Sequence, residues 1–222
     1  MCGRYTLHAK EEEIIKTFQL TDPILDYEPS YNIAPGQDVL VIIHDGKKKR
    51  AGYLRWGLVP SWAKDERIGY KMINARSETA HEKPSFKELM ARKRCLIVAD
   101  SFYEWKQTDE TRQPKRIQVK NQGLFTMAGL WDKWKKDGRT LFTCTILTKE
   151  ATGFIKDIHH RMPIILPREK ENEWIDPFVK HPYDAREFLY SFETDELTAY
   201  AVSTHVNKAS NNDETCIQPL SS

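Results

Sequence analysis

The residue with the most distinctive chemistry is Cys2, in the opening sequence Met-Cys-Gly-Arg-Tyr. Methionine aminopeptidases generally remove Met1 when the next residue is as small as cysteine, and the chain then begins with an amine and a thiol on one residue. The pKa of an α-amine is about 7.7–8.0, against about 10.4 for a lysine, so near neutral pH a sizeable fraction of the amine is uncharged. Such an amine forms an imine with an aldehyde, and the thiol, with a pKa of about 8.5, then closes a five-membered thiazolidine ring. The alternative is an ordinary cysteine in a frayed terminus.

A carboxylate lies between large aromatic residues in the segment FYEWK at 102–106. In a strand, Glu104 and Lys106 point to the face opposite Tyr103 and Trp105. Partial burial raises the pKa of a carboxyl group, which would suit Glu104 for proton transfer near neutral pH. A salt bridge from Glu104 to a basic residue at the strand end is the competing interpretation.

Two further polar segments could orient the reacting groups. The segment IHHRMP at 158–163 offers imidazoles as proton shuttles and Arg161 as a bidentate ligand for a phosphate. The segment MINARSET at 72–79 brings together the amide of Asn74 and the guanidinium of Arg76, which could orient an amine and bind phosphates. Alternatively, both segments only cap helices.

A formal net charge of +2 is too small to make the whole surface attractive to nucleic acid, so DNA binding would depend on local patches. Trp56 and Trp62 could stack on unpaired bases, although core packing is the more usual role. The basic clusters could equally be solvated hairpin or helix ends. They are Lys47 to Arg50, Arg92 to Arg94, and Lys115 with Arg116.

Alternating apolar segments bounded by turn residues predict a mainly antiparallel β protein. Two hairpins are expected to turn at Asp45-Gly46 and at Asp137-Gly138. Apolar periodicity predicts further strands at 95–100, 102–106, 116–119, 124–127, 162–166 and 197–203. It predicts helices at 8–18, 85–92, 148–158, 169–175 and 184–190. The fold class that follows is α+β, with a barrel-like sheet and peripheral helices.

Composition predicts one domain over residues 1–222, with a polar, loosely packed tail from about 207. The N-terminus has no apolar run and no later stretch is long enough to span a membrane, so we expect a cytoplasmic protein. The cysteines show no CxxC pair and no histidine at metal-ligand spacing, so we expect neither a metal nor another cofactor. Cys95 and Cys144 lie in apolar strands and should be small buried thiols.

Taken together and in order, nine segments resemble blocks of the SOS-response-associated peptidase (SRAP) family, whose bacterial and animal members act as sensors of abasic sites. The resemblance covers nearly the full chain and implies a β-rich, PUA-like fold. One such segment would be weak evidence, whereas nine in the right order are very specific. They are MCGRY, YNIAPGQ, RWGLVPSWA, INARSET, CLIVADSFYEWK, TMAGLW, TCTILT, IHHRMP and AVSTHVN.

The resemblance implies a role for each candidate residue. Cys2 would be the nucleophile that links to DNA, and Asn74 would place its α-amine. Glu104 and His159 would donate and accept protons on the opened sugar. The family motif puts its histidine two positions before the arginine, which favours His159 over His160. The implied DNA contacts are Arg4, Arg76 and Arg161 to phosphates and Trp105 to a base beside the lesion.

These roles predict a monomer that forms a thiazolidine cross-link with abasic sites in single-stranded DNA and shields the lesion during the DNA damage response. Such a protein would be nucleoid-associated when bound to DNA and would not bind membranes. Its imine stage would also permit weak AP-lyase activity, and release of Met1 would be a self-processing peptidase reaction.

Three alternatives remain open from the sequence. Class II glutamine amidotransferases also begin Met-Cys-Gly, which suggests an amidohydrolase with an N-terminal nucleophile. A cysteine peptidase could be built from Cys2, His159 and Glu104. A nucleic-acid-binding module without covalent chemistry would bind DNA reversibly and would not need Cys2.

Overall fold

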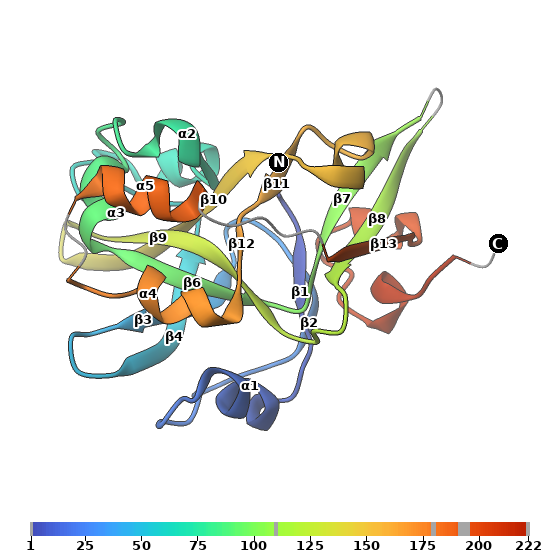
Figure 1. Ribbon diagram of the computed structural model, residues 1–222, viewed down its shortest axis with the longest axis horizontal. Coiled ribbons are helices and arrows are strands. Elements are labelled where there is room, and N and C mark those ends of the chain that lie inside the picture. The colour runs from blue at the N-terminus through green and yellow to red at the C-terminus, as the bar shows by residue number, and fades with distance from the viewer. Residues whose placement is uncertain (1, 109–110, 179–180, 191–195, 221–222) are drawn as a thin grey trace.

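The computed structural model of the protein describes residues 2–108, 111–178, 181–190 and 196–220 (Figure 1). Its centre is a closed barrel of five strands in the order β10-β4-β3-β6-β9, closed because β9 pairs with both β6 and β10. The pairs are antiparallel except that β4 runs parallel to β10. The strands are β3 (Asp38–His44), β4 (Lys49–Trp56), β6 (Arg94–Ala99), β9 (Phe125–Lys136) and β10 (Arg139–Glu150).

A second, antiparallel sheet of five strands stands beside the barrel, with its β7–β8 hairpin projecting away from it (Figure 1). Its order is β13-β8-β7-β1-β2. The chain passes from β6 of the barrel to β7 of this sheet through Asp100 alone, so the two sheets meet at that point. The strands are β1 (Tyr5–Leu7), β2 (Ser30–Ile33), β7 (Ser101–Gln107), β8 (Arg112–Val119) and β13 (Leu197–Ala201).

Three short strands complete the barrel side. β5 (Asn74–Arg76) runs parallel to β10, and β11 (Arg161–Pro163) pairs antiparallel with the same strand. β12 (Ile165–Leu166) pairs with β9. Strand β10 therefore has neighbours on both of its edges near its carboxyl end.

Peripheral helices cover the barrel (Figure 1). Helix α1 buries Ile14 and Phe18, and α3 and α5 pack against each other. The α-helices are α1 (Glu11–Phe18), α2 (Ser77–Ala80), α3 (Lys87–Arg92), α4 (Glu171–Trp174) and α5 (Pro182–Tyr190). Short 3-10 helices are η1 (Glu66–Lys71), η2 (Gly153–Asp157), η3 (Arg168–Lys170), η4 (Thr204–Asn207) and η5 (Glu214–Ile217). The predicted α+β class with a barrel-like, mainly antiparallel sheet is confirmed.

Local turn chemistry produces both predicted hairpins. At the β9–β10 turn Asp137 has φ of 50° and Gly138 has φ of 75°, and Lys136 pairs with Arg139 across the two-residue loop. Positive φ at both central residues is the geometry of a type I′ turn, whose twist matches that of the flanking strands. The β3–β4 turn likewise has Gly46 at φ of 92°.

The predicted helix at 148–158 is wrong in its first half. Thr148, Lys149 and Glu150 end strand β10, where they pair with β11, and only 153–157 is helical. The pairing partners lie far away in the sequence or after a turn, so local periodicity did not reveal them. The same reason explains why β1, β2 and β5, of three or four residues each, were not predicted.

Burial distinguishes the two tryptophans that could stack on bases and tests the burial predicted for two cysteines. Trp56 is 1% exposed and its Nε1 donates to the carbonyl of Ile73, so it packs in the core and cannot stack on a base. Trp62 is 59% exposed. The prediction that Cys95 and Cys144 are buried thiols is confirmed.

The polar tail is mostly exposed, yet hydrogen bonds join it to β2. The Asn32 amide donates to the carbonyls of Val206, Lys208 and Asn211, and Cys216 is fully buried. The side-chain amide of one β2 residue thus binds three carbonyl groups of the C-terminal segment, an arrangement that polar composition alone does not indicate. Within the described ranges no helix has the length and apolar character that a membrane crossing requires.

Candidate functional site

The candidate site consists of Cys2, Asn74, Glu104 and His159, which come from four separate segments. Asn74 on β5 donates a hydrogen bond of 2.8 Å to the Cys2 carbonyl. The Tyr103 amide donates to the Arg4 carbonyl, so the residues before β1 run alongside β7 toward Glu104. The junction of barrel and second sheet therefore brings the amino-terminal segment between β5 and β7.

The Cys2 thiol is fully buried and takes part in no disulfide. Burial raises the pKa of the Cys2 thiol well above its ordinary value, and the nearby negative charge of Glu104 raises it further. The thiol is thus protonated near neutral pH. A protonated thiol is a weaker nucleophile than a thiolate.

Asn74 occupies its place because β5 is paired with the barrel strand β10, where Asn74 lies opposite Ile146. Its Nδ2 is used by the Cys2 carbonyl. Its Oδ1 is buried and has no hydrogen-bond partner among the described residues. A buried acceptor without a donor costs about 1–3 kcal/mol, so this oxygen is ready to receive an N–H or O–H donor near Cys2.

Glu104 is 3% exposed, in the middle of β7. Burial raises the pKa of its carboxyl group, and a hydrogen bond from the Trp105 amide acts in the opposite direction. The net rise keeps more of the carboxyl protonated near neutral pH than in water. Glu104 can therefore both accept and donate a proton, as the sequence predicts for a partly buried carboxyl.

The backbone of Arg161 holds the His159 side chain. His159 Nδ1 lies 3.0 Å from the Arg161 amide nitrogen and 3.2 Å from the Arg161 carbonyl oxygen, so the backbone of Arg161 fixes the orientation of the ring. Burial lowers the pKa of His159, so the ring is mostly neutral near pH 7. The ring of exposed His160 stacks on it with centroids 4.3 Å apart.

Arg161 does not lie on the surface. Its side chain is buried, pairs with both carboxylate oxygens of Glu78 at 2.7 and 2.9 Å, and donates to the Thr148 carbonyl. Contact with a phosphate therefore stays a prediction for Arg161, whereas its present bonds fix the backbone that holds His159. The role of Glu78 was missed in the sequence, where its place in the INARSET block was the available signal.

The other residues predicted to contact DNA are more exposed than Arg161: Arg4 and Trp105 are partly buried, and Arg76 is exposed. Arg4 is half-buried, donates to Asn32 and to the Val206 carbonyl, and lies over the Trp105 ring at 5.9 Å. The Trp105 indole donates to Asn207 Oδ1 at 2.7 Å. Hydrogen bonds to Val206 and Asn207 thus hold the Arg4 and Trp105 side chains, while Arg76 is exposed on β5.

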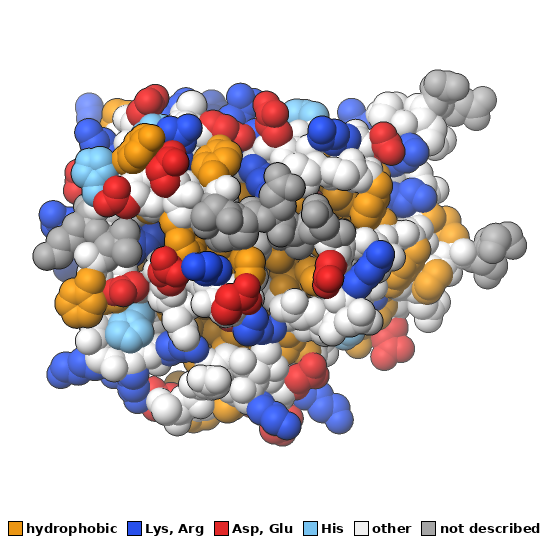
Figure 2. Space-filling model, in the orientation of Figure 1, with side chains coloured by type: hydrophobic (Ala, Val, Ile, Leu, Met, Phe, Trp, Pro, Cys, Tyr) orange, Lys and Arg blue, Asp and Glu red, His pale blue; other side chains and the backbone are white. Residues whose placement is uncertain are grey.

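Acidic partners pair with some of the cations in two of the three basic clusters. Lys48 and Arg50 both pair with Asp22, at 2.7 and 3.0 Å. Lys93 pairs with Asp132 at 2.7 Å. Figure 2 shows the same mixture of basic and acidic side chains over one face of the molecule. Ion pairing therefore lowers the positive charge that these two clusters offer to a polyanion.

The third cluster is divided between core and surface. Arg116 is buried, where it donates to Ser101 Oγ and to the Tyr200 hydroxyl. Lys115, its neighbour on β8, is half-exposed on the opposite face of the strand.

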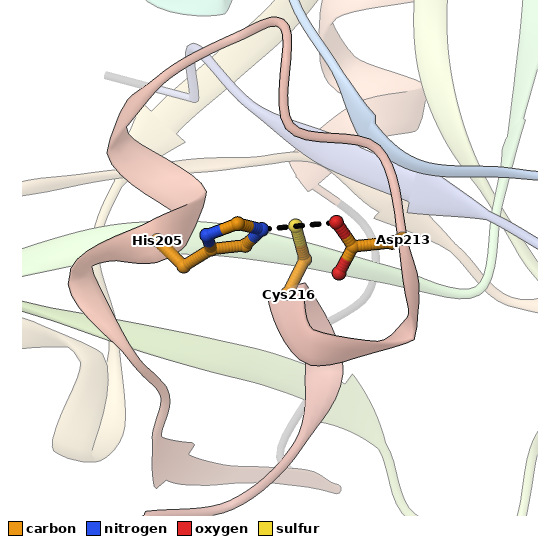
Figure 3. Close-up of side chains that lie close together, drawn as sticks. All are labelled: His205, Asp213 and Cys216. Carbon is orange, nitrogen blue, oxygen red and sulfur yellow. Dashed lines mark hydrogen bonds and ion pairs between the residues drawn. The ribbon is translucent and has the colours of Figure 1, made fainter.

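A histidine, a carboxylate and a thiol converge in the tail (Figure 3). The ligand atoms of His205, Asp213 and Cys216 lie within 4.8 Å of one another, close enough to hold a metal ion. Each group already has a hydrogen-bond partner: His205 Nε2 bonds Asp213 at 3.0 Å, and the Cys216 thiol donates to the Asn211 carbonyl. We interpret the cluster as a set of hydrogen bonds that closes the tail.

Comparison with known proteins identifies the family. The family model of the SOS response associated peptidases (SRAP) matches residues 1–209. The chain belongs to the SRAP family. That range includes Cys2, Asn74, Glu104 and His159, and the resemblance seen in the sequence is confirmed.

Curated SRAP relatives bear names that refer to one DNA lesion. The abasic site processing protein YoaM of Bacillus subtilis is 50% identical over 216 residues, which cover 96% of this chain and 95% of that protein. The abasic site processing protein HMCES of Gallus gallus is 35% identical over 228 residues, covering 87% of this chain and 67% of that protein. A crystal structure of a protein from Bacteroides thetaiotaomicron has a TM-score of 0.89 at 28% identity and covers 99% of this chain and 100% of that one.

Proposed function

We propose that this SRAP protein captures abasic sites in single-stranded DNA as a covalent thiazolidine on Cys2, after Met1 has been removed. The main support is the hydrogen bond from Asn74 to the Cys2 carbonyl, beside the buried carboxyl of Glu104. A terminal cysteine held in this way has a proton donor at hand. The names of the abasic site processing relatives agree with this substrate.

The reaction begins with the opening of the abasic sugar. In the closed form, C1′ carries a hydroxyl and is bonded to the ring oxygen. His159 in its protonated, imidazolium form gives a proton to the ring oxygen as the bond to C1′ breaks, which leaves the His159 ring neutral, and ionised Glu104 takes the proton of the C1′ hydroxyl. The products of this step are the open-chain aldehyde and a protonated Glu104.

The amine of Cys2 then attacks first, because burial keeps the thiol protonated. Addition to the aldehyde carbon forms a carbinolamine, and the hydroxyl leaves as water with the proton that Glu104 donates. The thiol adds to the imine carbon, and its proton passes to nitrogen. One water is lost overall, and the closed ring resists hydrolysis better than an imine.

The same intermediates predict the side reactions. An imine at C1′ acidifies the neighbouring carbon, so β-elimination would cut the strand and give weak AP-lyase activity. Hydrolysis of the Met1–Cys2 bond is the simplest peptidase reaction that a thiol with Glu104 and His159 would support. A completed cross-link would shield the lesion from other enzymes, and one copy of the chain would suffice for it.

Incubation of the purified protein with a single-stranded oligonucleotide containing one abasic site tests the proposal. We expect an adduct that survives heat and SDS without borohydride reduction. Its intact mass should equal that of the chain starting at Cys2 plus the oligonucleotide minus one water. Cys2→Ala should form no such adduct, and Cys95→Ala is the matched control because Cys95 is also fully buried.

Protein carrying a protease-cleavable extension before Cys2 should react only after cleavage exposes the amine. An adduct seen only after borohydride treatment would contradict ring closure. Reversible binding that is equal in the wild type and Cys2→Ala, with no adduct, would refute the proposal in favour of a simple binding module.

A further inference from the structure

A pocket of about 400 Å³ lies between η2 and the second sheet. Its polar lining includes three lysines, Lys106, Lys115 and Lys120, and its rim includes Phe154, which is 40% exposed. Pockets of about 300–1,000 Å³ hold small ligands, so this one has room for a nucleotide. We refer to it as the lysine pocket.

The lysine pocket adjoins the candidate site. Lys115 on β8 lies directly opposite Glu104 on β7, so the two side chains share one face of the sheet. Lys106 follows Glu104 by two residues on that face. On the other wall, Ile158 lines the pocket and precedes His159 in the chain. A strand bound at the candidate site could therefore continue into the pocket.

The lysines of this pocket lack the partners that neutralise the other clusters. Throughout the described part of the chain, no carboxylate forms an ion pair with Lys106, Lys115 or Lys120, whereas Lys48 and Lys93 each have one. Asp157 is the one carboxylate in the lining. Three lysines against one carboxylate leave the lining with a net positive charge, which favours a polyanionic ligand.

The aromatic ring of Phe154 favours one class of polyanion, single-stranded nucleic acid. Phe154 offers a flat apolar surface beside the cations. Phosphates tracked by lysines and bases stacked on aromatic rings are the usual features of sites for single-stranded nucleic acid. A duplex would keep its bases stacked inside and would not use the ring.

We propose that the lysine pocket binds the nucleotides on one side of the abasic site, with phosphates on Lys115 and Lys120 and a base against Phe154. The proposal rests on the function proposed above and adds a subsite to it. It offers a chain with a net charge of +2 a local site for a polyanion, because three lysines line one pocket beside the reactive residue.

Reversible binding tests this subsite separately from the covalent step. Full-length Cys2→Ala protein is titrated with a fluorescent oligonucleotide that carries a tetrahydrofuran abasic analogue, which has no aldehyde, at several salt concentrations. Adding Lys115→Ala and Lys120→Ala should weaken binding several-fold and reduce the slope of log affinity against log salt by about 1.4, at about 0.7 per phosphate contact on single strands. Matched control substitutions at Lys135 and Lys136, on the distant β9–β10 hairpin, should leave the slope unchanged.

Two single variants give signatures that general damage would not produce. Phe154→Ala should weaken binding without changing the salt slope, because it removes stacking and no charge. Asp157→Asn should strengthen binding, because it removes the negative charge from the pocket. Thermal unfolding establishes that each variant is folded. An oligonucleotide shortened on the side that occupies the pocket should lose affinity for the wild type and very little for the double lysine variant.

Equal affinity and equal slope in the double lysine variant and its Cys2→Ala parent would overturn the pocket proposal. Adduct formation by protein with an intact Cys2 distinguishes this failure from that of the proposed function. If such protein forms no adduct with abasic DNA, the proposed function fails, whatever the titration shows. If adducts form at the same rate at limiting protein with and without the two lysines, only the pocket proposal fails.

Discussion

Replacing Glu78 by glutamine removes a carboxylate from the buried ion pair with Arg161. Arg161 is 5% exposed and donates hydrogen bonds of 2.7 and 2.9 Å to the two carboxylate oxygens of Glu78. Breaking a fully buried pair costs about 3–5 kcal/mol. The Glu78 side chain is 33% exposed and Arg161 keeps its bond to the Thr148 carbonyl, so we expect a smaller loss of about 1.5–3 kcal/mol, typical of a hydrogen bond to a charged group.

The pH dependence of this loss has a definite sign. Burial by itself raises the pKa of Glu78, but the hydrogen bonds and charge of Arg161 outweigh it, and the net pKa is lowered. Ionised Glu78 thus stabilises the fold fully above its unfolded-state pKa of about 4.3, and this contribution is lost as the pH falls through the folded-state value. The difference between wild type and Glu78→Gln should be complete at pH 7 and shrink below pH 4.

Urea denaturation at pH 7 and at pH 3.5 measures both quantities. For a domain of this length the loss corresponds to a fall in Tm of about 3–12 °C. Glu173→Gln is the control, because it breaks an exposed ion pair with Lys170 and should cost no more than about 1 kcal/mol. We also expect slower adduct formation in Glu78→Gln, since the Arg161 amide holds His159. If Glu78→Gln and Glu173→Gln unfold alike at pH 7, the ion pair does not have the role assigned to it.

Two further predictions concern the carboxyl of the site and the barrel. Burial raises the pKa of Glu104, so the stabilising contribution of its carboxyl group is present below the unfolded-state pKa of about 4.3 and is lost as the pH rises through the folded-state pKa. The Tm of Glu104→Gln should therefore be higher than that of the wild type at pH 8 but not at pH 4. Adduct formation by Glu104→Gln should fall. A lower Tm for Glu104→Gln at pH 8 would contradict this. A Cβ at Gly129 would lie 2.8 Å from Cys95 Sγ and from Ile97 Cδ1, so Gly129→Ala should cost about 1–3 kcal/mol in urea denaturation. Gly52→Ala meets nothing within 4 Å and should be no less stable than the wild type, and equal losses in the two variants would count against the steric argument.

Much of the fold could be predicted because its signals are local. The turn at Asp137-Gly138 depends on backbone conformations that these two residues adopt readily. The alternation in β7 correctly separated Glu104 from Tyr103, and the apolar runs around Cys95 and Cys144 indicated burial. The helix predicted from 148 failed because its first residues obtain their pairing partners from β11.

The residue types of the candidate site were also evident in the sequence, but not their arrangement. The family blocks pointed to Cys2 and Asn74, whereas the hydrogen bond between them joins residues 72 positions apart. The raised pKa of Cys2, which makes the amine the first nucleophile in our proposal, arises from burial and from Glu104. No local pattern reports such contacts.

The sequence by itself determined the family, the fold class and the residue types of the candidate site, because turn chemistry, strand alternation and ordered motifs are properties of short segments. Only the tertiary structure decided which charges are neutralised and which remain available. It paired Lys93 with Asp132 and buried Arg161 on Glu78, yet it left Lys115 without an acidic partner among the described residues and opposite Glu104. Ion pairing and burial depend on segments that folding brings together from distant parts of the chain, and so they are decided only when the chain has folded.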